Sequence, residues 1–221
     1  MQAAAKIESA RRNMLLQQIR PWEVIDERVL AAMEQIPREQ FVAESQRGMA
    51  FADVALPLAH GETMMEPKLE ARMLQALAIH PGERVLEVGT GSGYVTACLT
   101  AIGGPLTSID IHGDFVDAAK TRLAALGCGP VDWRTGDIYD FGSPASGYDA
   151  IAVTGSLPVY DERLQAHLAI GGRLFVIVGE APAMQAMLVT RVDQDAFRQE
   201  SLFETAVAPL PGGVDLTAAA T

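Results

Sequence analysis

The sequence predicts an α/β fold in which a mostly parallel, seven-stranded sheet carries helices on both faces and follows a helical N-terminal part. From Arg84 onward, short apolar segments alternate with amphipathic segments, which is typical of strand–helix–strand units. A glycine-rich turn at residues 89–93 joins the first of these strands to a helix. The length of 221 residues, 49% of them hydrophobic, allows one domain with a modest appendage. We therefore expect residues 1–221 to form a single domain.

The N-terminal part, residues 1–80, is expected to be helical. Helices are predicted at residues 4–20, 28–35 and 67–79, with loops and short elements at 41–62. The apolar face of the first helix would hold Ile7, Met14, Leu15 and Ile19, which recur at helical spacing. Asp26 is expected to cap the second helix, and Pro67 suits the first position of the third.

The second part, residues 81–210, contains the predicted sheet. Parallel strands are expected at residues 84–88, 106–110, 131–135, 148–154 and 172–179, with helices at 114–126 and 161–168 and one that reaches residue 99. Two segments near the end, 186–192 and 199–209, alternate like antiparallel strands. Residues 211–221 form a tail with no clear pattern.

Charge and cysteine usage narrow the function classes. The net charge of −11 and the pI of about 4.8 disfavour a nucleic-acid partner, because an acidic surface repels phosphates. The two cysteines, Cys98 and Cys128, have no metal-site or disulfide spacing. The chain lacks the roughly 20-residue apolar run of a membrane span. We expect a cytoplasmic protein without a membrane partner.

The glycine-rich turn is the strongest ligand signal. A strand leads through Glu87 into Gly89, Gly91 and Gly93, a G-x-G-x-G spacing in which glycine lets the backbone approach a ligand closely. Dinucleotide sites have G-x-G-x-x-G and hold a pyrophosphate at the helix N-terminus. The carboxylate of Glu87 fits poorly beside a pyrophosphate and suits a cation or an amino group.

Acidic residues at the next two strand ends complete a pattern. Asp110 lies about 20 residues further on, where a carboxylate can accept both ribose hydroxyls. Asp137, followed by Ile138, can receive the exocyclic amino group of an adenine and cover its face. A ligand with an adenine, a ribose and an amino-acid end but no phosphate is S-adenosylmethionine. The candidate cofactor-binding residues are Glu87, Gly89, Thr90, Gly91, Ser92, Gly93, Asp110, Ile111, Gly136, Asp137, Ile138 and Thr154.

Simpler interpretations stay open for single members of this set. The glycines alone can serve a strand-to-helix turn, Asp110 alone can be a solvated strand end, and Asp137 alone can form an Asx-turn. The spacing of the whole set favours the cofactor.

Motifs along nearly the whole chain, from about residue 11 to 210, resemble the protein-L-isoaspartate O-methyltransferase family. The N-terminal motifs are Arg11, Met14, Gln18 and Ile19, DERVLAAM at 26–33, IPREQFV at 36–42 and AFADVALPL at 50–58. The core motifs are VLEVGTGSGY, SIDIH, TGDIYD, YDAIAVTGS and IGGRLFVIVG. The resemblance implies a Rossmann-like core that binds S-adenosylmethionine. It also implies methylation of the α-carboxylate of isoaspartyl residues in damaged proteins, a reaction that needs no general base.

The segment before the third predicted helix, residues 60–66, departs from the family pattern, and we call it the lip. The family has G-Q-T-I-S followed by one residue and proline, whereas residues 61–67 of this chain read GETMMEP. Thr63, Met65 and Glu66 are the candidate substrate-edge residues, and Met65 stands where the family serine helps hold the substrate carboxylate. The thioether of Met65 donates no hydrogen bond, and Glu66 adds a negative charge. Glu66 is expected either to cap the helix or to occupy the place of a substrate carboxylate.

Two alternatives to isoaspartyl methylation follow from the lip. The chain could be a family member that methylates a different substrate, or a non-catalytic protein that keeps the cofactor as a structural element. The four histidines are scattered through the sequence, so no metal site is expected. The sequence does not predict an oligomeric state.

Overall fold

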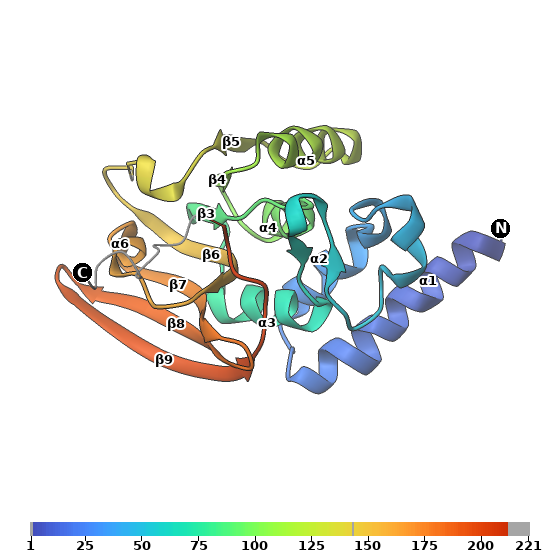
Figure 1. The fold of residues 1–221 in the computed structure, drawn as a ribbon, viewed down its shortest axis with the longest axis horizontal. Helices are drawn as coiled ribbons and strands as arrows, with labels where there is room; N and C mark the ends of the chain where they lie inside the picture. The colour runs from blue at the N-terminus through green and yellow to red at the C-terminus, as the bar shows by residue number, and fades with distance from the viewer. Residues whose placement is uncertain (1, 143, 212–221) are drawn as a thin grey trace.

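The computed structural model describes residues 2–142 and 144–211, so the predicted tail, apart from Pro211, lies outside the described residues. A seven-stranded sheet has the order β5-β4-β3-β6-β7-β8-β9 (Figure 1). The strands of this sheet are β3 (Val85–Val88), β4 (Leu106–Asp110), β5 (Val131–Thr135), β6 (Tyr148–Leu157), β7 (Leu168–Glu180), β8 (Ala183–Asp193) and β9 (Ala196–Thr205). Two short antiparallel strands of the N-terminal part, β1 (Leu56–Pro57) and β2 (Thr63–Met64), form a separate sheet.

The strand pairing confirms the predicted mostly parallel sheet. β3 pairs in parallel with β4 on one side and with β6 on the other, and the parallel pairs continue to β5 and β7. β8 and β9 add antiparallel pairs at one edge. Because the strand order reverses between β3 and β6, the carboxyl ends of these strands are the expected position of a ligand crevice.

The helices largely follow the sequence prediction. They are α1 (Gln2–Met14), which continues as a π-helix (Leu15–Ile19), α2 (Glu27–Gln35), α3 (Pro67–Leu77), α4 (Tyr94–Ile102), α5 (Gly113–Leu126) and α6 (Glu162–Gln165). Turns of 3₁₀-helix lie at Arg20–Trp22, Arg38–Gln40, Glu44–Met49, Ala59–Gly61 and Ile138–Asp140. Asp26 accepts a hydrogen bond from the Arg28 N–H at the start of α2, and Pro67 is the first residue of α3, as the sequence predicts.

The two faces of the sheet pack into two hydrophobic clusters. One joins buried residues of α2, α3 and α4 to sheet residues such as Val85 and Phe175. The other contains Leu86, Val153 and Leu164, the last from α6. Helical and sheet parts therefore share a continuous core, while the proposed division near residue 80 stays a prediction.

Two predictions about the elements were wrong. Ile7 is 37% exposed, because α1 extends away from the sheet and only its C-terminal end is covered (Figure 1). The helix expected at 161–168 has only four residues. It ends early because β7 begins at Leu168, which pairs with Tyr148 of β6.

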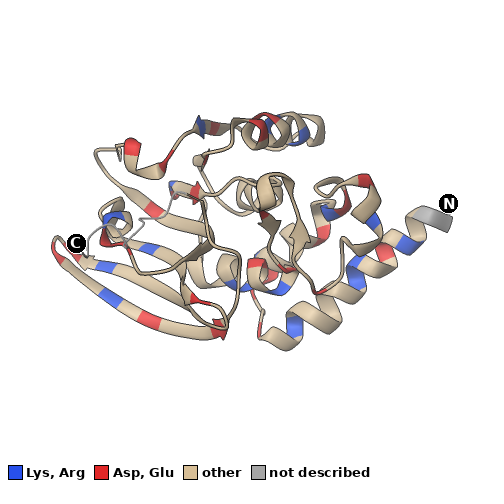
Figure 2. Ribbon diagram, in the orientation of Figure 1, with Lys and Arg blue, Asp and Glu red and all other residues tan. Residues whose placement is uncertain are grey.

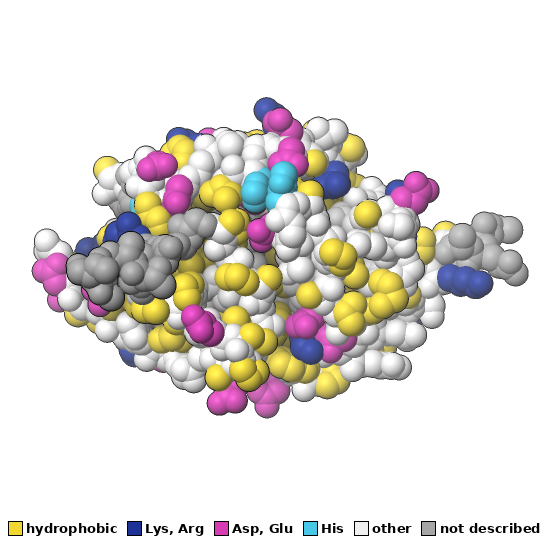
Figure 3. Space-filling model, viewed as in Figure 1, with side chains coloured by type: hydrophobic (Ala, Val, Ile, Leu, Met, Phe, Trp, Pro, Cys, Tyr) yellow, Lys and Arg dark blue, Asp and Glu magenta, His cyan; other side chains and the backbone are white. Residues whose placement is uncertain are grey.

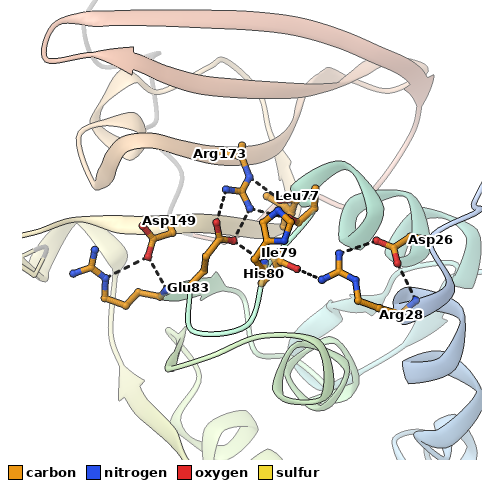
Figure 4. Close-up of polar contacts among 10 residues, drawn as sticks. Asp26, Arg28, Leu77, Ile79, His80, Glu83, Asp149 and Arg173 are labelled. Carbon is orange, nitrogen blue, oxygen red and sulfur yellow. Dashed lines mark hydrogen bonds and ion pairs between the residues drawn. The ribbon is translucent and has the colours of Figure 1, made fainter.

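Polar contacts attach α2 and α3 to the sheet (Figure 4). Arg173 of β7 donates to the Leu77 carbonyl at 2.7 Å and to Glu83 at 2.7 and 2.9 Å. Arg28 of α2 donates to the Ile79 carbonyl at 2.6 Å. Carbonyls at the end of α3 thereby receive donors from both sides, which fixes α3 beneath the lip.

Acidic and basic side chains are interspersed on most elements, and β8, β9 and α1 carry both signs (Figure 2). Within the described residues no helix combines the length and apolar character that a membrane crossing requires.

Candidate cofactor pocket and acceptor cavity

A large, partly open cavity with about 810 Å³ of empty space lies at the carboxyl ends of β3, β4, β5 and β6. Each of these strand ends contributes to its wall. The predicted residues that line it are Gly89, Gly91, Asp110, Ile111, Gly136, Asp137, Ile138 and Thr154. The structure thus brings together eight of the twelve residues that the sequence singled out for a cofactor.

The glycine turn leaves no room for side chains. Gly89 has a φ of 96°, and a Cβ there would lie 2.3 Å from the Thr154 hydroxyl oxygen. Gly93 has a φ of 83°, and its Cβ would lie 2.7 Å from the Cβ of Ala119 in α5. Positive φ favours glycine at both positions. Gly93 therefore serves the packing of α4 on α5, whereas Gly89 gives the turn its close approach to β6.

Asp110 organises the cavity wall through backbone contacts. Its Oδ2 accepts a hydrogen bond from the Gly91 N–H at 2.9 Å, and its Oδ1 accepts one from the His112 N–H at 2.9 Å. The side chain is buried and lines the cavity. A carboxylate held in this way fixes the glycine turn relative to β4 and keeps further lone pairs for a ligand.

Asp137 makes the turn contact that the sequence left open and also lines the cavity, so its role in holding an adenine stays a prediction. Its carboxylate accepts from the Tyr139 N–H at 3.0 Å and so caps a short 3₁₀ turn. Asp137 also lines the cavity beside the buried, apolar Ile138. An acceptor next to a flat apolar surface is the arrangement that an adenine ring requires.

Glu87 lies behind the glycine turn and does not line the cavity. Its Oε2 accepts from the hydroxyls of Thr96 and Ser108 at 2.5 Å each, and its Oε1 is buried without a partner among the described residues. Burial raises the pKa of Glu87 to about 8, against the lowering effect of the two hydroxyls. Glu87 therefore supports the turn from beneath and keeps one unsatisfied polar atom there.

A second cavity of about 280 Å³ adjoins the first, and Leu58, Thr63, Gly89, Gly91 and Thr154 line both. Its own lining includes Met64, Met65, Glu70, Thr90, Ser92 and Val95. Two candidate substrate-edge residues, Thr63 and Met65, thus face a space next to the glycine turn. Met64 and Met65 are each 4% exposed and belong to the hydrophobic core. Both side chains therefore pack in the core and also line the second cavity.

A buried ion pair that the sequence pattern did not single out lies at the second cavity, which Glu70 lines. Arg38 and Glu70 are both buried and hydrogen-bonded to each other. Arg38 also donates to the carbonyls of Ala50 and Met65 at 2.8 Å each and lies over the Tyr94 ring. Burial raises the pKa of Glu70 to about 7, against the lowering effect of Arg38. Arg38 therefore holds the backbone of the lip in place.

Two roles were expected for Glu66, either as the cap of α3 or in the place of a substrate carboxylate, and the structure shows neither role completely. It is the N-cap residue of α3, yet its side chain makes no capping hydrogen bond. It is absent from the described linings of both cavities. Burial raises the pKa of Glu66, while Lys68 lowers it and Asp53 raises it further. A role for Glu66 at the substrate edge stays a prediction.

Residues that the sequence analysis did not assign complete the cavity mouth. Ala208, Pro209, Leu210 and Pro211 form one wall. The wall is attached to β6, because the Ser156 N–H donates to the Ala208 carbonyl at 3.0 Å and the Leu210 N–H donates to the Ser156 carbonyl at 2.9 Å. From the lip and from the residues after β4, Glu62 and His112 also line the cavity. A Pro-Leu pair late in the sequence was the one available signal for the wall.

The sheet order, the glycine turn and the acidic strand ends define the class: an α/β protein with a nucleoside-binding crevice at the switch point of a parallel sheet. A sequence model described as "Protein-L-isoaspartate(D-aspartate) O-methyltransferase (PCMT)" matches residues 10–215. The chain belongs to this family.

Curated relatives and solved structures agree with this assignment. Protein-L-isoaspartate O-methyltransferase 1 of Rhodopseudomonas palustris is 42% identical over 210 residues, covering 95% of this chain and 86% of the relative. The enzyme of Methylorubrum populi is 37% identical over 207 residues, covering 94% and 97%. A crystal structure from Plasmodium falciparum, a putative family member in complex with S-adenosyl-L-homocysteine, has a TM-score of 0.75 at 22% identity and covers 92% of this chain and 97% of that one. At that identity the likeness shows the fold, and it confirms the predicted Rossmann-like architecture.

Proposed function

We propose that this protein transfers a methyl group from S-adenosylmethionine to the α-carboxylate of isoaspartyl residues in proteins or peptides. The observation that carries the proposal is the pair of adjoining cavities that share the glycine turn. Membership of the family supports both the donor and the acceptor. The predicted cytoplasmic location and the absence of nucleic-acid partners stay predictions.

The residues present fit the methyl donor. The large cavity offers Asp110 for a ribose, and Asp137 with Ile138 for an adenine. Glu87 keeps an unpartnered buried oxygen beneath the turn. The described lining of this cavity contains no lysine or arginine, which suits a ligand without phosphates. The bound donor supplies a sulfonium methyl group.

The second cavity is the proposed place of the acceptor carboxylate. The acceptor forms a bond from a carboxylate oxygen to the methyl carbon, the carbon–sulfur bond breaks, and its electron pair stays on sulfur. No proton is removed, so the protein acts by holding and desolvating two reactants. Thr63 offers a hydroxyl at this cavity, and Glu70 lies in its floor.

Charge at the second cavity is compatible with an anionic acceptor. Glu70, the charged residue in the described lining, is paired with Arg38. Glu66, which raised the main objection to this substrate, interacts with the charge of Lys68, which also pairs with Asp53, and lies outside the described linings of both cavities. The objection from Glu66 is therefore weaker in the structure than in the sequence.

The test compares an isoaspartyl peptide with the same peptide containing normal aspartate, using a labelled methyl donor and methanol release after base treatment. We expect transfer to the isoaspartyl peptide alone. Asp110→Ala should weaken donor binding by more than about tenfold, because each lost hydrogen bond to a charged group is worth roughly 1.5–3 kcal/mol. The control is Asp132→Ala, which removes an exposed carboxylate paired with Arg134 on β5.

Met65→Ser separates the acceptor proposal from the donor proposal. The serine adds a hydroxyl at the second cavity, so KM for the isoaspartyl peptide should fall while donor binding stays unchanged. Tight donor binding without any transfer to the isoaspartyl peptide, in both the wild type and Met65→Ser, would refute this acceptor.

A further inference from the structure

Three metal-ligating side chains from two distant parts of the sequence meet at the mouth of the large cavity. His60 comes from the lip, His112 is the N-cap residue of α5, and Asp114 lies in the first turn of α5. One ligand atom from each of the three lies within 4.8 Å of the other two. Figure 3 shows histidine side chains gathered at one place on the viewed face, with acidic side chains beside them. The sequence analysis expected scattered histidines, and the fold brings two of the four together.

The two imidazole rings lie face to face. Their centroids are 4.1 Å apart and their planes differ by 6°. His60 Nε2 lies 2.9 and 3.0 Å from the two carboxylate oxygens of Asp114. His112 Nε2 is buried and has no hydrogen-bond partner among the described residues. A buried ring nitrogen that nothing satisfies, next to a second imidazole and a carboxylate, is an unfilled coordination position.

The chemistry of the donors selects the kind of ligand. Two imidazoles and one carboxylate suit zinc and neighbouring divalent transition metals, whereas magnesium and calcium prefer oxygen donors throughout. In a tetrahedral zinc site with bonds of about 2.0–2.1 Å, two ligand atoms lie about 3.4 Å apart. The His60 and Asp114 ligand atoms are 2.9 Å apart, and all three ligand atoms lie within 4.8 Å of one another. Small side-chain rotations that open the first distance and bring His112 closer would therefore give zinc spacing.

We propose that His60, His112 and Asp114 bind one divalent transition-metal ion of the zinc type and that this ion joins the lip to the start of α5. The three protein ligands leave a fourth position open to solvent. Glu62 lies beside the site and lines the cavity. Burial raises the pKa of Glu62, and His112 and His60 offset only part of this increase. Because His112 and Glu62 both line the large cavity, the metal site forms part of the entrance to the proposed cofactor pocket.

Zinc titration by calorimetry tests the site, on protein without a histidine tag and with Cys128→Ser to remove the half-buried thiol. We expect one equivalent to bind. His60→Gln, His112→Gln and Asp114→Asn should each weaken binding by more than about 100-fold, since even loss of an outer partner of a metal site costs roughly 10–100-fold. Magnesium should give no binding heat.

His80→Gln is the matched control, because His80 is an exposed histidine on a different turn. It should bind zinc like the parent. Hydrogen exchange gives a second measurement: zinc should slow amide exchange in the lip of the parent and of His80→Gln, but not in His60→Gln. Equal zinc affinity in the parent and the three ligand variants, or no binding at millimolar zinc, would overturn the proposal.

Discussion

Replacing Glu87 by glutamine should remove a pH dependence from the folding stability. Burial raises the pKa of this carboxyl from 4.5 to about 8 in the folded chain. Between these values the folded state keeps a proton that the unfolded state has lost. The stability contribution of Glu87 is therefore fully present below pH 4.5 and is lost as the pH rises toward 8, with a slope of about −1.4 kcal/mol per pH unit.

Glutamine imitates the protonated carboxyl in shape, keeps an acceptor for the hydroxyls of Thr96 and Ser108 and does not titrate. The difference in unfolding free energy, variant minus wild type, should grow by about 2–3 kcal/mol between roughly pH 5.5 and 7.5. Urea denaturation of the cofactor-free protein at several pH values measures this difference. Glu70 titrates in the same direction in both proteins, and its charge is the smallest of the causes that raise the pKa of Glu87, so subtraction removes most of its contribution. Parallel stability curves for the two proteins would refute the reasoning.

Two further predictions concern packing and the buried ion pair. Gly93→Ala should destabilise the fold by about 1–3 kcal/mol more than Gly127→Ala in urea denaturation. Both glycines have positive φ, but a Cβ at Gly93 meets Ala119 whereas one at Gly127 meets nothing within 4 Å; equal losses would contradict this. Arg38→Met should cost about 3–5 kcal/mol, because it leaves Glu70 buried without its partner. Adding Glu70→Gln should recover part of that loss, and additive losses in the double-mutant cycle would show that the two side chains are not coupled.

Local patterns account for the parts of the fold that the sequence predicted well. The strand at 106–110 and the one at 131–135 have the observed bounds, since short segments with β-branched and aromatic residues between glycine and proline turn residues indicate strands directly. The glycine turn and Asp110 were readable for the same reason, because their spacing reflects one strand–turn–helix unit. The end of α6 could not be predicted from the local sequence, since it depends on the pairing of Leu168 with Tyr148 of β6, 20 residues earlier in the sequence.

The acceptor side was harder to predict because its residues meet only in the folded chain. Arg38 and Glu70 are 32 residues apart and lie on elements whose packing no local pattern specifies. His60 and Asp114 are 54 residues apart. Met65, which the sequence assigned to the substrate edge, lines the second cavity together with residues of the glycine turn, and its role there stays a prediction. It could not show that Arg38 binds the carbonyl of Met65.

The wall formed by residues 208–211 has a consequence for synthesis of the chain on the ribosome. These residues are translated after β9, yet they close a cavity whose other walls come from β3 to β6. A nascent chain that has already folded its parallel strands still lacks one side of the pocket. Tight cofactor binding therefore has to await synthesis of residues 208–211, and a chain interrupted before residue 208 would have its sheet formed but one wall of its pocket missing.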